Sequence, residues 1–259
     1  MEITDHIDAL RREGTLLADA AAGTDLAAPV PTCPDWRLRD LVLHTGQVHR
    51  WVTANVRDAH RTRMDADGER AAWGPEPDDA DLVDWFRTGH ATLVATLTAA
   101  PADLDCWSFL PAPSPLAFWA RRQAHETAVH RTDADAAAGV EGPRVDAELA
   151  LDGIDELLRG FMSLDRTRVR SERPRTVLVR PTDGDRPGPW LLTVSREQLS
   201  VELPPGGPAD APAADLTLSG PAHDLYLLLW NRLPVDTDRV TRSGDRSLLD
   251  LWREGAAVR

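Results

Sequence analysis

Between Leu116 and Asp133 the chain places polar side chains along a face where a helix would ordinarily be apolar. Read at helical spacing, one stripe consists of Trp119, Gln123, Glu126, His130 and Asp133, at steps of four, three, four and three residues. A carboxylate that is buried without a partner costs several kcal/mol, so an inward-facing stripe of this kind needs partners in the core. The chain must therefore build a helical core around a polar centre.

Two members of this stripe are suited to hold a metal ion together. Glu126 and His130 are four residues apart, so their side chains lie one turn apart and can converge on one ion. His125 is turned roughly 100° or more around the helix from both and cannot join them. The string HETAVH is thus not the zinc-protease pattern with two histidines four apart, and a third ligand must come from another helix.

The best third candidate is His44, which lies on the stripe of Leu41, His44, Val48 and Trp51. It is the only ionisable group on that apolar seam, which indicates that it points to the core. A lone core histidine is usually a hydrogen-bonded filler, but one divalent ion would satisfy His44, Glu126 and His130 at once. A set of three ligands leaves coordination positions open, which is typical of a catalytic metal site.

Three runs of sequence carry a resemblance to a known family. The segments Val30 to Trp51, Phe118 to Asp135 and Ser219 to Pro234 resemble the mycothiol-dependent maleylpyruvate isomerase family, an actinobacterial group with a DinB-like metal-binding bundle and a smaller C-terminal domain. The resemblance assigns the metal ligands to His44, Glu126 and His130. These are the same three residues that the helical spacing selects.

The pattern and the resemblance together predict a two-domain protein of the α plus α/β class. Residues 1–165 are expected to form a DinB-like four-helix bundle, and residues 172–259 a small C-terminal α+β domain similar to sterol-carrier domains. Periodicity and turn signals predict helices at about 3–22, 36–55, 79–99, 116–138, 145–164, 221–232 and 247–254, and strands at 175–180, 190–195, 198–203 and 214–218. We interpret residues 59–78 as a loop long enough to cover a site.

The composition limits which kinds of binding partner and which cellular compartment we expect for this protein. The net charge of −13 disfavours nucleic acid and anionic membrane surfaces, and no apolar run approaches the ~18–20 residues of a membrane span. The two cysteines, Cys33 and Cys106, make no disulfide framework, and the charged N-terminal residues do not form a signal peptide. We therefore expect a cytoplasmic protein, either monomer or homodimer.

The metal site with open positions suggests a chemistry. A low-molecular-weight thiol would bind there as thiolate and attack a small electrophilic substrate, giving either S-transfer or cis–trans isomerisation. The expected ion is zinc, and the resemblance implies mycothiol as the thiol co-substrate. Two alternatives stay open, a metal-dependent hydrolase or amidase that activates water and a non-catalytic metal-binding regulatory protein.

Four further side chains have two readings each. The resemblance implies that Arg232 holds a substrate carboxylate, whereas its place at a helix C-terminus also suits a cation on dipole grounds alone. Asp133 either orients His130 or is a surface acid at the end of its helix. His90 is a candidate extra ligand or proton carrier, or a core histidine, and Arg122 is either a contact at the rim of the site or a solvated charge.

Overall fold

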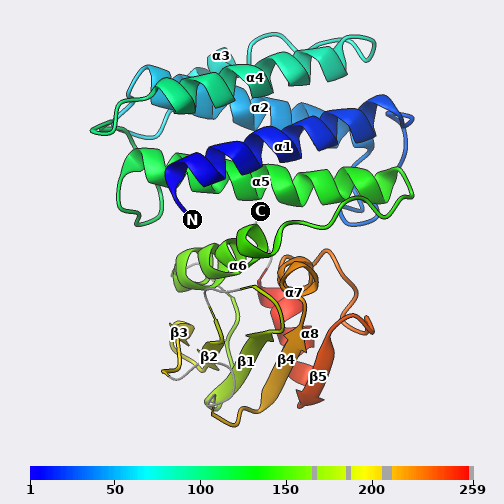
Figure 1. The fold of residues 1–259 in the computed structure, drawn as a ribbon, viewed down its shortest axis with the longest axis vertical. Helices are drawn as coiled ribbons and strands as arrows, with labels where there is room; N and C mark the ends of the chain where they lie inside the picture. The colour runs from blue at the N-terminus through cyan, green and yellow to red at the C-terminus, as the bar shows by residue number, and fades with distance from the viewer. Residues whose placement is uncertain (165–167, 185–187, 206–211, 257–259) are drawn as a thin grey trace. The chain divides into compact units, whose positions relative to one another are not determined.

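The chain divides into two compact units, Met1–Pro143 and Arg144–Arg259, in a computed structural model that describes residues 1–164, 168–184, 188–205 and 212–256 (Figure 1). The domain boundary predicted at residue 165, together with the following two residues, lies outside these ranges. The helix predicted at 145–164 as part of the bundle belongs instead to the second unit. It is an α-helix over Ala147–Asp155 and continues as a π-helix (Glu156–Gly160) and a 3-10 helix (Phe161–Ser163).

The first unit is a bundle of long helices, as predicted. Its long helices are α1 (Ile3–Ala22), α2 (Leu38–Arg57), α4 (Leu82–Ala99) and α5 (Pro115–Ala137), and a short α3 (Ala66–Trp73) lies in the segment expected to be a loop. Helix α1 packs against α5 and α4, and α2 packs against α4 and α5 (Figure 1). The packing of α2 against α5 brings the two predicted ligand seams together.

Local sequence explains the limits of α5. Ser114 accepts a hydrogen bond from the backbone N–H of Ala117, and Pro115 occupies the first turn, where its missing N–H has no helical partner to lose. The helix ends before Gly139, whose φ of 67° is a left-handed conformation that glycine adopts without strain. The helix that carries the candidate ligands is therefore fixed at both ends.

Helix α5 also has a second polar face, which joins it to α1. The Arg131 guanidinium is buried and donates to the Glu13 carboxylate at 2.8 Å and to the Asp135 carboxylate at 2.8 Å. It also donates to the Pro143 carbonyl at 2.6 Å. A buried pair of this kind is costly to break from one side, so these contacts specify how α1 lies on α5.

Among its described residues, the second unit has a five-stranded mixed sheet of order β3-β2-β1-β4-β5. Its elements are α6 (Ala147–Asp155), β1 (Arg175–Pro181), β2 (Trp190–Val194), β3 (Ser200–Glu202), β4 (Leu216–Gly220), α7 (Ala222–Leu229), β5 (Thr241–Gly244) and α8 (Ser247–Gly255). Strand β1 pairs antiparallel with β2 and parallel with β4, while β5 pairs antiparallel with β4. Helices α6 and α7 pack against each other (Figure 1). The α+β domain predicted for this part is confirmed, with β5 as an unpredicted strand.

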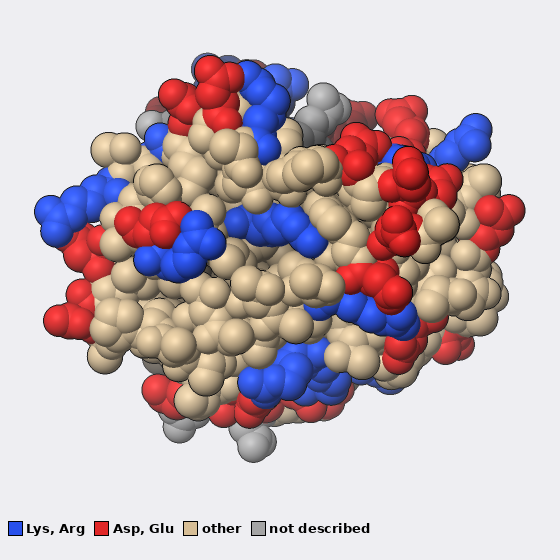
Figure 2. Space-filling view, turned by 90° about the horizontal axis from the view of Figure 1, so that it is seen from above, with Lys and Arg blue, Asp and Glu red and all other residues tan. Residues whose placement is uncertain are grey.

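Acidic and basic side chains are interspersed across the face of the molecule shown in Figure 2. Among the helices within the described ranges, none is both long and apolar enough to cross a membrane.

Candidate metal centre

The three predicted ligand residues lie together in the first unit. Glu126 Oε1 is 3.3 Å from His130 Nε2 and 3.5 Å from His44 Nε2, and one ligand atom of each residue lies within 4.8 Å of the other two. The rings of His44 and His130 are nearly perpendicular, at 81°, with centroids 5.3 Å apart. The site is thus built from two turns of α5 and one position of α2.

The distances fit a small metal ion. Two donors bound to a tetrahedral zinc ion with bonds of about 2.0–2.1 Å would be about 3.3 Å apart, close to the two separations from Glu126. Two imidazole nitrogens and one carboxylate oxygen are ligands that zinc accepts readily. The side chains of His44 and Glu126 are 39% and 24% exposed, whereas that of His130 is 10% exposed, so the cluster is reached from the His44 side.

Trp36 forms one wall of this cluster. Its ring centroid lies 4.9 Å from that of His44 and 5.9 Å from that of His130, and it is stacked on His130 at an interplanar angle of 28°. An aromatic wall limits the movement of both imidazoles and reduces the access of water. Trp36 lies two residues before the start of α2, so the segment that leads into the His44 helix also shapes the site.

Glu126 is ionised in this setting. Burial opposes its charge and raises the pKa, but hydrogen bonds with His130 and His44 and the charges of His130 and Arg122 outweigh burial and hold the pKa well below the usual range. The Arg122 guanidinium donates to Glu126 Oε2 at 3.1 Å. One carboxylate oxygen thus contacts an arginine, and the other faces the two histidines.

His130 lies between two carboxylates. Its Nε2 contacts Glu126, and its Nδ1 lies 3.0 Å from Asp133 Oδ2. Burial lowers the pKa of His130, yet the hydrogen bonds with Asp133 and Glu126 and their charges outweigh burial and raise it to about 9. The Thr32 hydroxyl donates to Asp133 Oδ1 at 2.6 Å, so the carboxylate is held from both sides.

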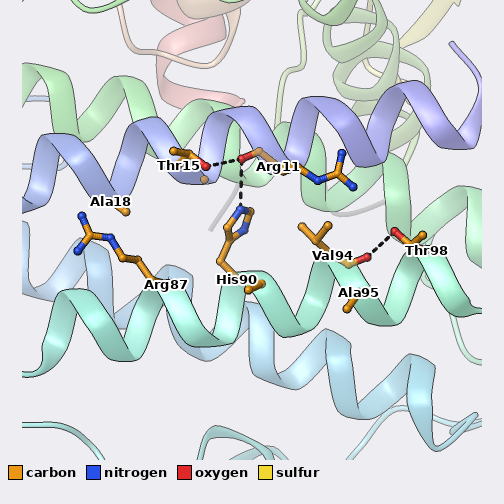
Figure 3. Close-up of a pocket in the computed structure, with 10 residues that line it drawn as sticks. Arg11, Thr15, Ala18, Arg87, His90, Val94, Ala95 and Thr98 are labelled. Atoms are coloured by element: carbon orange, nitrogen blue, oxygen red, sulfur yellow. Dashed lines mark hydrogen bonds between the residues drawn. The ribbon is translucent and has the colours of Figure 1, made fainter.

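Other histidines are separate from this cluster. His125 is fully buried, and its ring lies 6.0 Å from that of His6 on α1, which agrees with its predicted exclusion from the ligand face. His90 is buried on α4, and its Nε2 lies 3.3 Å from the carbonyl oxygen of Arg11 (Figure 3). Burial lowers the pKa of His90, so it is neutral at pH 7. The structure thus favours the core reading of His90 over the ligand reading.

His90 borders a groove of about 690 Å³ between α1 and α4 (Figure 3). The groove is lined by Arg11, Gly14, Thr15, Ala18, Arg87, His90, Ala91, Val94, Ala95 and Thr98, and contains none of the three candidate ligands. Both of its arginines form ion pairs on their own helices, Arg11 with Asp8 and Arg87 with Asp84. We therefore locate the candidate site at the histidine–glutamate cluster rather than in this groove.

Arg232 lies in the second unit, beyond the end of α7. Its Nη1 donates to the Trp230 carbonyl at 2.8 Å, and its backbone N–H donates to the Leu227 carbonyl at 2.7 Å. Asn231, directly before it, has a φ of 61°, which ends the helix as expected for asparagine in the left-handed region. The helix was predicted to run to Arg232, but α7 ends three residues earlier at Leu229, because the left-handed backbone at Asn231 stops it. The substrate role of Arg232 stays a prediction.

Sequence reasoning underestimated two residues of the cluster and missed a third. Arg122 is only 4% exposed, rather than a solvated charge, and its spacing of four residues from Glu126 could have indicated the ion pair. Trp36 was assigned no role at the site, although it lies two residues before the start of the His44 helix. Thr32 had no local signal, because it is 101 residues from Asp133 in sequence.

Comparison with known proteins agrees with the fold of both units. The sequence model of the mycothiol maleylpyruvate isomerase N-terminal domain matches residues 7–135, and that of the corresponding C-terminal domain matches residues 148–251. The crystal structure of the mycothiol-dependent maleylpyruvate isomerase is 11% identical, with a TM-score of 0.61 over 94% of this chain and 93% of that one. A histidine-to-alanine variant of that enzyme gives a TM-score of 0.62 at the same identity and coverage. These structures share the fold, and no curated protein matches the sequence.

Proposed function

The chain belongs to the mycothiol maleylpyruvate isomerase family, and on that basis we propose that it is a metal-dependent enzyme that uses mycothiol as a nucleophile. The substrate is a small electrophilic molecule, and the outcome is S-transfer or cis–trans isomerisation. The expected ion is zinc. The observation that carries the proposal is the convergence of His44, Glu126 and His130 within 4.8 Å at a partly exposed site.

In this proposal His44, Glu126 and His130 hold the ion. When bound, a divalent ion stabilises the thiolate form of a thiol that reaches it, so that the thiol becomes nucleophilic near neutral pH. The chain contributes the surroundings. Arg122 binds the outer oxygen of Glu126 and fixes its orientation, and Trp36 covers one side of both imidazoles.

The thiolate sulfur would attack an electrophilic carbon of the second substrate. Loss of a leaving group from that carbon gives S-transfer. Addition to a carbon–carbon double bond, rotation about the resulting single bond and elimination of the thiolate give cis–trans isomerisation. In both outcomes, the sulfur comes from the external thiol, since Cys106 is buried and Cys33 contacts Asp133 through its Sγ at 3.7 Å.

The first experiment measures metal content and thiol binding together. Purified wild-type protein is expected to contain about one zinc ion per chain and to bind mycothiol in calorimetry only when zinc is present. The Glu126→Ala/His130→Ala double variant should lose both properties. His125→Gln is the matched control, because His125 is adjacent to Glu126 but faces α1, and it should keep both. A double variant that keeps its zinc would contradict the ligand assignment.

The second experiment separates the two catalytic alternatives. Turnover of an electrophilic substrate should require added mycothiol, and Cys33→Ser and Cys106→Ser should retain activity. Turnover that is the same without thiol would favour the hydrolase or amidase. A protein that is isolated without metal and remains inactive after zinc is added would favour a regulatory role.

The third experiment concerns Arg232, which we propose binds a carboxylate of the substrate through two parallel hydrogen bonds. Arg232→Ala should keep its zinc and its fold but lower kcat/KM about tenfold or more, and Arg232→Lys should recover only part of the loss. The readout is steady-state kinetics alongside metal analysis. An unchanged kcat/KM would reduce Arg232 to a residue that caps the C-terminal end of α7.

A further inference from the structure

Asp133 is a fully buried carboxylate one turn beyond His130 on α5, with 0% of its surface exposed. Its Oδ2 lies 3.0 Å from His130 Nδ1, and its Oδ1 accepts a hydrogen bond from the Thr32 hydroxyl at 2.6 Å. Cys33 Sγ contacts Oδ2 at 3.7 Å. Both oxygens of Asp133 are thus engaged, and one of them contacts a candidate metal ligand.

The chemistry of these partners determines which ring nitrogen of His130 carries the hydrogen. An ionised carboxylate has only acceptor sites, so the hydrogen bond at 3.0 Å requires a hydrogen on Nδ1. In the neutral imidazole, the lone pair is then on Nε2, the atom that lies 3.3 Å from Glu126. This is the tautomer that a ligand histidine needs if Nε2 is to bind a metal ion.

We propose that Asp133 is a positioning residue of the metal centre, which holds His130 with Nε2 directed toward the ion, and that Thr32 holds Asp133 in place. The inference rests on the proposed metal function. It assigns a role to the segment before α2. Thr32 lies in the same stretch as Trp36 and His44, so its hydrogen bond to Asp133 connects both ligand-bearing parts of the chain.

The neighbouring carboxylate of Asp135 has a purely structural role, which differs from the role proposed for Asp133. Asp135 lies two residues further along α5 and is also buried, but its Oδ2 accepts from the Arg131 guanidinium at 2.8 Å. Its partner is a cation that joins α5 to α1, and no candidate ligand is involved. Asp133, in contrast, contacts a candidate ligand directly. The two residues therefore form a matched pair for mutagenesis.

The test compares zinc affinity, measured by competition with a chromogenic chelator, in wild type, Asp133→Asn, Asp133→Leu and Asp135→Asn. Asparagine keeps one acceptor but loses the charge, so affinity should fall about tenfold. Leucine removes every acceptor, so the fall should approach roughly 100-fold. Asp135→Asn should lower the stability of the metal-free protein but leave zinc affinity within about twofold, because Arg131 does not contact the site.

A second measurement, hydrogen exchange at His130 Nδ1, should change only if Asp133 contacts this nitrogen and not if Asp133 merely stabilises the fold. In the zinc-loaded wild type, nitrogen-15 NMR should show a slowly exchanging hydrogen on His130 Nδ1. The Asp133→Leu variant should exchange this hydrogen faster with water. If Asp133→Leu does not fold, Thr32→Val tests the same contact from the other side, with an expected loss of zinc affinity of roughly threefold.

The outcomes distinguish this inference from the proposed function. The positioning role would be overturned if zinc affinity and Nδ1 exchange were unchanged in Asp133→Leu, or in Thr32→Val if Asp133→Leu does not fold. That result would leave the proposed metal centre intact. A wild type that binds no zinc would instead refute the metal centre, and the role of Asp133 would fall with it.

Discussion

At the scale of single residues, His130 is both a candidate metal ligand and a group with a raised pKa. It contacts Glu126 through one nitrogen and Asp133 through the other, and its pKa of about 9 means that the metal-free protein carries an imidazolium there at neutral pH. This cation balances the charge of a carboxylate in the absence of a metal ion. A divalent ion and a proton therefore compete for the same imidazole.

The competition gives a prediction for calorimetry. At pH 7.5, zinc binding should release about one proton per ion from His130, because the ligand must be neutral. Titrations in buffers of different ionisation enthalpy measure this number. The release should vanish near pH 10, where the imidazole is already neutral, and apparent affinity should rise between these two values. A proton count of zero at pH 7.5 would contradict the pKa assigned to His130.

The same group predicts how the stability of the metal-free protein depends on pH. The folded pKa of His130, about 9, is above the ordinary value of 6.5, so its contribution is fully present below pH 6.5 and is lost as pH rises through 9. In chelator, wild type should exceed His130→Gln by roughly 1–3 kcal/mol in unfolding free energy at pH 6.5. Urea denaturation should show that the difference in unfolding free energy between the two proteins becomes smaller toward pH 10. A difference that stays constant with pH would mean that packing, and not charge, causes the effect.

At the scale of helices and strands, periodicity predicted the elements with a clear apolar face and missed those without one. The ligand face of α5 was visible because four of its five positions are polar at helical spacing. Helix α3 (Ala66–Trp73) was missed because eight residues, one of them Gly68, show too little period to stand out from a loop. Strand β5, Thr241–Gly244, was missed because its sequence has no apolar alternation. Its backbone hydrogen bonds with β4 hold it in the sheet.

The approach of α1 to α4 depends on a glycine and gives a prediction of its own. A methyl group added at Gly14 would lie 2.3 Å from Cε1 of His90, so Gly14→Ala should destabilise the protein by about 1–3 kcal/mol. Chemical denaturation checks this value. In a His90→Ala background, which removes the obstructing ring, the same change should cost much less. Equal costs in both backgrounds would show that His90 does not cause the strain.

At the scale of the whole molecule, the candidate metal centre belongs to one unit, while Arg232 belongs to the other. Met1–Pro143, a compact unit with its own core, contains all three candidate ligands. It also contains the residues around them, Arg122, Trp36, Asp133 and Thr32. The sequence predicted two domains, but it could not place the helix at 145–164, since an apolar face does not reveal which neighbour will cover it. Only the folded chain shows that α6 packs with α7.

This division predicts that residues 1–143 fold alone and bind zinc. The fragment ends at Pro143, so it keeps the carbonyl that accepts from Arg131. It should show a helical circular dichroism spectrum and bind one zinc ion with an affinity within about threefold of the full chain. The fragment with Glu126→Ala is the control and should bind none. A fragment that is unfolded in isolation would show that the second unit is needed for stability.

The hydrogen bond between Thr32 and Asp133 also bears on how the protein folds. These residues are 101 positions apart, and closing a loop of this length costs on the order of 4–5 kcal/mol of chain entropy. We therefore expect the contact to form after the local helices, once these have brought the two segments together. A chain still being synthesised would present scattered histidines and carboxylates but no aligned pair of ligand segments. In a refolding experiment, the gain of tight zinc binding would thus follow the appearance of helix, and would mark the final step in the assembly of the bundle.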